Sequence, residues 1–176
     1  MNRAALELLI RAASAITQER DLVIVGSQAI LGTMPMAPTV APELCVSREA
    51  DIYPMQRPEL ADLIDGAIGY GSAFDEQFGY YADGVGPETA VLPNGWQTRL
   101  VKVENENTGG GVGWCLDVHD LAVAKLAAGR EKDLAFVEAM LTHGIVGGAL
   151  LRERVAATAL QPERRELVQA WLAGRK

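Results

Sequence analysis

Two acidic residues separated by a single alanine stand at the start of an apolar stretch of this chain. Glu49 and Asp51 precede Ile52 and Tyr53. On an extended strand alternate side chains share a face, so the two carboxylates would point the same way. Carboxylates this close repel each other unless a cation lies between them, and Mg²⁺ prefers carboxylate and phosphate oxygens. The pair indicates a metal site, although two unrelated acids at a solvated strand end would give the same pattern.

A glycine and a serine follow an earlier apolar run. Leu22–Val25 is short and β-branched, which predicts a buried strand, and Gly26-Ser27 would turn the chain into a helix at about 28–31. Backbone N–H groups and a hydroxyl at the start of a helix bind anions, most often phosphate. A tight turn that needs a glycine is the other interpretation. Together with the two carboxylates, the turn predicts a site for a nucleotide and a metal ion.

Basic residues gather in a later helical stretch. An acidic residue, Asp117 or Asp120, can cap a helix that Gly129 interrupts and that continues over 131–142. Lys125 lies beside the apolar stripe of this helix, so its stem can be buried while its head reaches a cleft. Arg130, Lys132 and Asp133 follow shortly after it. A solvated lysine followed by surface ion pairs would explain the same residues.

The remaining elements must position these groups. Apolar periodicity, proline positions and turn residues predict the other helices and strands. Helices are expected at 2–19, 58–67, 73–78, 147–159 and 162–173, a strand at 49–53, and a hairpin over 97–116. Residues 33–46 and the remainder of 69–95 show no clear periodicity and are expected to be irregular. This order predicts an α/β (α+β) fold, in which a small mixed sheet is flanked by helices and followed by a C-terminal helical segment.

The motifs, taken in order, resemble a known superfamily. The strand, Gly26-Ser27, the helix, and Glu49-x-Asp51 on the next strand are similar to the nucleotidyltransferase fold of the polymerase β superfamily. The stretch 120–133 is similar to the Leu-Ala-x-x-Lys-Leu…Arg-x-Lys-Asp helix of AbiEii/MenT-type bacterial nucleotidyltransferases. The resemblance covers about residues 20–145 and implies a nucleotidyltransferase-like domain over 1–145 with a helical extension, 146–176, packed on it. Glu49 departs from the usual Asp, and the 21 residues before it form a longer spacer than is usual.

The resemblance implies transfer of a nucleoside monophosphate from a nucleoside triphosphate (NTP) with Mg²⁺ as cofactor. Glu49 and Asp51 would hold the metal. The superfamily's third carboxylate should follow from a later strand, and Glu104 is the expected residue, with Asp117 as the alternative. The acceptor is left open between an RNA end, a protein and a small molecule.

The same resemblance assigns roles to the other motif residues. Gly26 and Ser27 would hold the triphosphate, and Lys125 would contact phosphate. Asp133 would orient or assist the acceptor. Arg130 is a further phosphate ligand, and Lys132 is a second candidate for that role.

Composition limits the classes of function. A net charge of −7 argues against a protein that coats nucleic acid without specificity. Cys45 and Cys115 have no spacing typical of a metal or disulfide framework. Glu7 and Arg11 interrupt the first apolar run, which makes a poor signal peptide, and no stretch is long enough to span a membrane. A cytoplasmic protein without membrane partners is therefore expected.

Two functions remain at this point. The first is a metal-dependent nucleotidyltransferase, which could be the toxin half of a toxin–antitoxin pair with an antitoxin as partner. The second is a degenerate nucleotidyltransferase fold that binds a nucleotide or a protein without catalysis, because a fold can persist after its reaction is lost.

Overall fold

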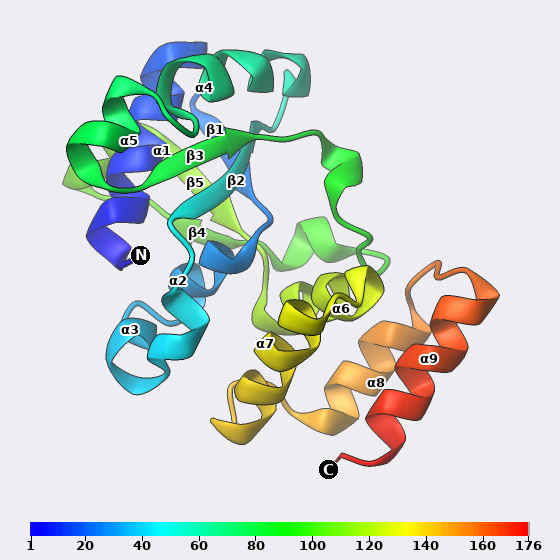
Figure 1. Ribbon diagram of the computed structural model, residues 1–176. Coiled ribbons are helices and arrows are strands. Elements are labelled where there is room, and N and C mark those ends of the chain that lie inside the picture. Colours follow the sequence, from blue (N-terminus) through cyan, green and yellow to red (C-terminus); the bar gives the residue numbers. More distant parts are fainter. Residues whose placement is uncertain (176) are drawn as a thin grey trace.

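A twisted sheet of five strands lies at the centre of the computed structural model, which describes residues 1–175 (Figure 1). The strand order is β3-β2-β1-β5-β4. The strands are β1 Asp21–Ile24, β2 Glu49–Pro54, β3 Tyr81–Gly84, β4 Val101–Val103 and β5 Val112–Cys115. β1 runs antiparallel to β2 and parallel to β5, while β3 is parallel to β2 and β4 antiparallel to β5. The predicted small mixed sheet is confirmed.

Helices cover the sheet and continue beyond it. Their bounds are α1 Arg3–Thr17, α2 Ile30–Thr33, α3 Ala37–Val40, α4 Ala61–Ile68, α5 Ala73–Phe78, α6 Val118–Ala128, α7 Glu131–Thr142, α8 Gly148–Ala156 and α9 Pro162–Ala173. α1 packs on β1, β2 and β5, and α4 packs on β2 and β3. α6 to α9 gather on the other side of the molecule, where α8 and α9 pack against α6 (Figure 1). The domain boundary at residue 145 stays a prediction.

The alternation of side chains along β2 and β3 separates a core face from a polar face. Ala50, Ile52 and Ala82 are fully buried. Their neighbours Asp51 and Asp83 are only partly buried and point to the opposite face. Burial of the apolar face against α1 and α4 fixes the strand register, because a slip by one residue would move the carboxylates into the core. Packing of this face therefore determines where the acids lie.

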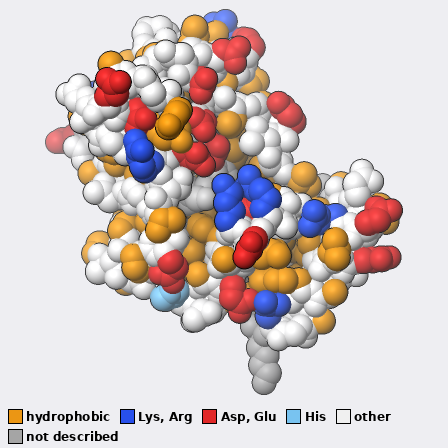
Figure 2. Space-filling view, in the orientation of Figure 1, with side chains coloured by type: hydrophobic (Ala, Val, Ile, Leu, Met, Phe, Trp, Pro, Cys, Tyr) orange, Lys and Arg blue, Asp and Glu red, His pale blue; other side chains and the backbone are white. Residues whose placement is uncertain are grey.

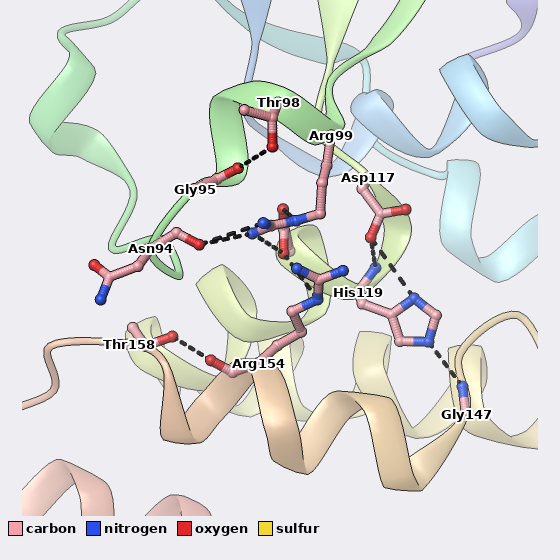
Figure 3. Close-up of polar contacts among 10 residues, drawn as sticks. Asn94, Gly95, Thr98, Arg99, Asp117, His119, Gly147, Arg154 and Thr158 are labelled. Carbon is pink, nitrogen blue, oxygen red and sulfur yellow. Dashed lines mark hydrogen bonds and ion pairs between the residues drawn. The ribbon is translucent and has the colours of Figure 1, made fainter.

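A buried ion cluster joins the C-terminal helices to the rest of the molecule (Figure 3). Asp120 on α6 is fully buried, and its two oxygens accept hydrogen bonds from Arg99 at 2.8 and 3.1 Å. Arg154 on α8 approaches the same carboxylate at 3.8 Å. Arg99 also donates to the carbonyl of Asn94. The cluster thus ties α6, α8 and the segment before β4 to one another.

Three expected features differ from the structure. The irregular stretch 69–95 contains β3 as well as the predicted helix α5, and 33–46 contains α3 and a 3-10 turn, Pro42–Cys45. The first strand of the hairpin expected over 97–116 is shorter, since Trp96–Arg99 forms a 3-10 turn before β4. Proline-rich and glycine-rich segments have no periodicity of their own, so packing against neighbouring elements decides their conformation. Within residues 1–175 no helix is both long and apolar enough to cross a membrane.

Candidate functional site

The turn after β1 lies directly against the acidic strand. The N–H of Val25 donates to the carbonyl of Asp51 at 3.1 Å, and Gly26 follows at once. A Cβ atom built on Gly26 would lie 1.6 Å from Oδ2 of Asp51. Any side chain at position 26 would therefore displace the carboxylate. The Gly26-Ser27 turn and the Glu49-x-Asp51 strand are therefore in contact. Ser27 begins the 3-10 turn Ser27–Ala29 beside them.

A third carboxylate lies on the neighbouring strand. In the parallel pairing of β2 with β3, Asp51 stands opposite Asp83 and Glu49 stands opposite Tyr81. The hydroxyl of Tyr81 donates to Oε2 of Glu49 at 3.1 Å. Asp83 is not among the expected site residues, because it lies in a stretch that was expected to be irregular. The alternation of Tyr81, Ala82 and Asp83 was the available signal.

The acids on this face repel one another. Burial raises the pKa of Asp83 to about 6, with further contributions from Glu49, Asp51 and Asp65. Burial also raises the pKa of Asp51, and Glu49 adds to the rise, whereas three basic side chains oppose it. These are Lys125, Arg130 and Lys132. A bound cation would relieve the repulsion among these carboxylates.

The basic side chains come from the corner between α6 and α7. Gly129 ends α6 with φ of +64°, a conformation that favours glycine, and the chain reverses into α7. Nε and Nη2 of Arg130 donate to the carboxylate of Asp133 at 2.6 and 3.2 Å. Nζ of Lys125 lies 3.4 Å from the same carboxylate. The corner thus presents two cations held by one buried acid.

The carboxylate of Asp133 is fully engaged by Arg130 and Lys125. It is 1% exposed, and both of its oxygens face cations. Burial alone would raise its pKa, but Arg130 and Lys125 hold the pKa below the ordinary value. The geometry makes Asp133 a positioning residue for the two cations, whereas the resemblance had implied a role toward the acceptor.

One cavity of about 800 Å³ brings the predicted residues together. The residues of both motifs that line it are Gly26, Ser27, Glu49, Asp51, Lys125, Arg130, Lys132 and Asp133. Figure 2 shows the corresponding hollow, with acidic side chains over β2 and basic side chains above the start of α7. An anion that lay between Gly26 and α7 would meet backbone N–H groups on one side and cations on the other.

Glu104, the expected third carboxylate, is elsewhere. It follows β4 at the far edge of the sheet, where it accepts a hydrogen bond from Arg20 at 2.7 Å and pairs with Lys102. The alternative, Asp117, caps α6 by accepting from the N–H of His119 at 2.9 Å. Neither lines the cavity. Both assignments are corrected, because the strand that pairs with β2 on its outer edge is β3 and not β4.

The other end of the cavity is apolar. It is lined by Leu44 and Val46 from the segment before β2, and by Ala135, Phe136 and Ala139 from α7. Lys125 lies between the two ends, since its Nζ is 5.4 Å from the centroid of the Phe136 ring. The spacer that separates Ser27 from Glu49 therefore contributes a wall of the site.

The donor set fits Mg²⁺. Among residues 1–175 no three Asp, Glu, His or Cys side chains converge on one metal position. Mg²⁺ commonly binds through one or two carboxylates and completes its shell with water and substrate phosphates. Asp51 and Glu49 share a strand face, and they line one cavity with Gly26, Ser27 and the basic side chains, so they can supply those carboxylates.

Comparison with known proteins shows the family of the chain. Residues 4–171 match a family model described as a nucleotidyltransferase of unknown function (DUF6036). Searches of curated proteins and of solved structures gave no match. Since the model spans nearly the whole chain, this protein belongs to that nucleotidyltransferase family.

Proposed function

We propose that the protein transfers a nucleoside monophosphate from an NTP to an acceptor, with Mg²⁺ as cofactor. The observation that supports this most is the contact between Gly26 and Asp51, opposite the basic corner, in one cavity. A phosphate turn, a pair of carboxylates and converging cations are the parts that phosphoryl transfer requires. Family membership supports the general class of reaction.

Each part has a role in this proposal. The N–H groups and hydroxyl of Gly26-Ser27 bind the triphosphate, and Lys125 and Arg130 bind phosphate oxygens from the opposite wall. Asp51 and Glu49 hold Mg²⁺, which when bound would neutralise charge on the phosphates. Asp133 keeps both cations in place, so that they do not reorganise during the reaction.

The proposed reaction is a nucleophilic substitution at the α-phosphorus of the NTP. A nucleophile of the acceptor forms a bond to the α-phosphorus, the bond from that phosphorus to the bridging oxygen of the β-phosphate breaks, and pyrophosphate leaves. The proton of the acceptor passes to a carboxylate of this sheet face. Asp83 is a candidate because it stands opposite Asp51, just outside the residues that line the cavity. Its raised pKa of about 6 makes it a better proton acceptor than an ordinary aspartate.

The acceptor and the biological role are proposed from the charge of the chain and from its resemblance to known families. A net charge of −7 favours a small molecule, a protein or a single RNA end over a long nucleic acid. The resemblance of 120–133 to AbiEii/MenT-type enzymes supports a toxin with an antitoxin partner. If this holds, expression of the wild-type chain in a bacterial host will arrest growth and expression of Asp51→Asn will not.

Transfer of label tests the reaction itself. Purified protein is incubated with Mg²⁺, a cell lysate and each of the four NTPs labelled at the α-phosphate. We expect label to enter an acceptor fraction with wild type and with Asp62→Asn, an exposed acid on α4, but not with Asp51→Asn. Absence of transfer with all four NTPs, combined with measurable NTP binding, would instead support the degenerate fold that binds without catalysis.

A further inference from the structure

The apolar end of the cavity is built by two segments that are distant in sequence. Leu44 and Val46 face it from the spacer before β2, and Phe136 faces it from α7. Val46 is 78% exposed and lines the cavity, so its side chain is accessible to a ligand there. Figure 2 shows hydrophobic side chains in the hollow between the α3 segment and α7.

The two ends of the cavity match the two ends of a nucleotide. Along α7, the first turn supplies Lys132 and Asp133 to the charged end, whereas Phe136 and Ala139 lie further along and face the apolar end. The helix advances about 1.5 Å per residue, so Lys132 and Ala139 are about 10 Å apart along its axis. A triphosphate at the start of α7 therefore leaves an apolar space for the base one to two turns further on.

One charged group borders this apolar end. Glu43 lines the cavity, and its Oε1 lies 2.6 Å from Nε2 of His143, the residue that follows α7. A carboxylate offers about four lone-pair positions, so the contact with His143 leaves acceptor capacity on both oxygens. The backbone N–H of Glu43 and the His143 ring hold the pKa of this carboxyl below its usual value. Glu43 is therefore an ionised group that only accepts hydrogen bonds at neutral pH.

We propose, on the basis of the function above, that the apolar end binds the base of the NTP and that Glu43 selects guanine. The Watson–Crick edge of guanine carries two adjacent donors, N1–H and the N2 amino group, which a carboxylate can bind together. Adenine and cytosine place an acceptor nitrogen beside their single amino donor, and uracil places a carbonyl on each side of its N3–H. A carboxylate would face a lone pair in all three, so each is disfavoured.

Nucleotide binding tests this selection without dependence on turnover. Calorimetric titration uses Mg²⁺ and the α,β-methylene analogues of GTP, ATP, CTP and UTP, which cannot release the nucleoside monophosphate. The proteins are wild type, Glu43→Gln and Glu59→Gln, the last an exposed glutamate paired with Arg57 outside the cavity. A bidentate contact predicts about tenfold or stronger preference for the guanine analogue in wild type and Glu59→Gln. Glu43→Gln should lose most of that preference and bind the adenine analogue as before.

A second variant tests the position of the base. Val46→Asp places a charge in the apolar end at an exposed position, where it does not disturb the core. We expect it to weaken binding of all four analogues about tenfold or more, because an unpaired charge would face the base. The melting temperature should match that of wild type.

The outcomes separate the two proposals. Equal affinities for the four analogues, or a guanine preference that survives in Glu43→Gln, would overturn the role of Glu43 while leaving nucleotidyl transfer intact. Unchanged binding by Val46→Asp would place the base elsewhere. Absence of binding for every analogue in wild type would overturn the proposed function and this inference with it.

Discussion

At the scale of single residues, the site depends on a close approach between a glycine and a carboxylate. Gly26 has φ of −81°, which any residue can adopt, so backbone strain does not explain the glycine. The space above its Cα is occupied by the carboxylate of Asp51. Glycine fits this position because the Asp51 carboxylate occupies the place of a Cβ atom.

Gly26→Ala is the sharpest test at this scale. The added methyl group would push the Asp51 carboxylate aside, and a shift of this size can reduce a rate by about 100-fold. We expect label transfer to fall accordingly, while the melting temperature changes little. Gly66→Ala is the matched control, since a Cβ there meets nothing within 4 Å. Normal transfer by Gly26→Ala would show that Asp51 need not lie where the structure places it.

Asp83→Asn should stabilise the metal-free protein in a pH-dependent way. Burial and the neighbouring acids raise the pKa of Asp83 to about 6, above its value in the unfolded chain. Between about pH 4 and pH 6 the native state therefore holds more protons than the unfolded state, and stability falls as pH rises. The wild type therefore loses stability across this window, and the variant loses less, because only the raised pKa of Asp51 remains. Urea unfolding at pH 4 and pH 7.5 should show a gain for Asp83→Asn only at the higher pH.

Mg²⁺ provides the control for that measurement. A cation among the carboxylates should raise the stability of the wild type at pH 7.5 and narrow its difference from Asp83→Asn. An equal gain for the variant at both pH values would mean that the charge of Asp83 is not the cause.

At the scale of elements, the corner between α6 and α7 is the part that supplies positive charge. Gly129 permits the reversal, and Asp133 then binds a cation from each side of it. Neither helix alone would bring Lys125 and Arg130 together. Lys125 lies before the turn at Gly129, and Arg130 and Asp133 lie just after it, so the turn brings all three side chains together.

Lys125→Ala should weaken NTP binding by about 1 to 3 kcal/mol, the range of a charge-assisted hydrogen bond. Calorimetric titration with ATP and GTP measures the change, and urea unfolding should show that the fold is largely retained. Lys102→Ala is the control, since Lys102 pairs with Glu104 at the far edge of the sheet. Equal affinities in wild type and Lys125→Ala would remove this lysine from the site.

At the scale of the whole molecule, the position of the helical layer relative to the sheet sets the width of the cavity. The Asp120 cluster joins α6 and α8 to the segment that carries Arg99, and the chain just before that segment lines the cavity with Thr89 and Ala90. The isolated bridge between Pro93 and Thr158 strengthens the same junction. The C-terminal helices therefore support the wall of the site from behind.

Asp120→Ala should be strongly destabilising. It would leave the guanidinium of Arg99 without its buried partner, and loss of one member of a buried pair costs about 3 to 5 kcal/mol. Urea unfolding of Asp120→Ala and of the exposed control Asp62→Ala measures the difference. A loss no greater than that of the control would show that water can replace Asp120 at this junction.

The sequence by itself determined the local chemistry. Apolar periodicity predicted α1 and α7, because the buried side of an amphipathic helix recurs in consecutive turns. Pro58 predicted the helix that includes α4, and an acidic cap with Gly129 predicted α6. The phosphate turn, Glu49-x-Asp51 and the basic stretch 125–133 were recognisable because each lies within one or two adjoining elements. The broad nucleotidyltransferase class followed from them and is shown by the family match, while the finer AbiEii/MenT likeness stays a prediction.

Only the tertiary structure decided which groups meet. β3 has only four residues and lies in glycine-rich surroundings, so the alternation of Tyr81, Ala82 and Asp83 is too short to predict a strand by itself. Pairing with β2 is what places Asp83 opposite Asp51. Glu104 has a plausible local pattern, yet strand order places it at the opposite edge of the sheet. The spacer before β2 likewise became a wall of the cavity only through its packing on α7. Contacts between distant segments depend on the whole set of packing partners, which no short window of sequence contains.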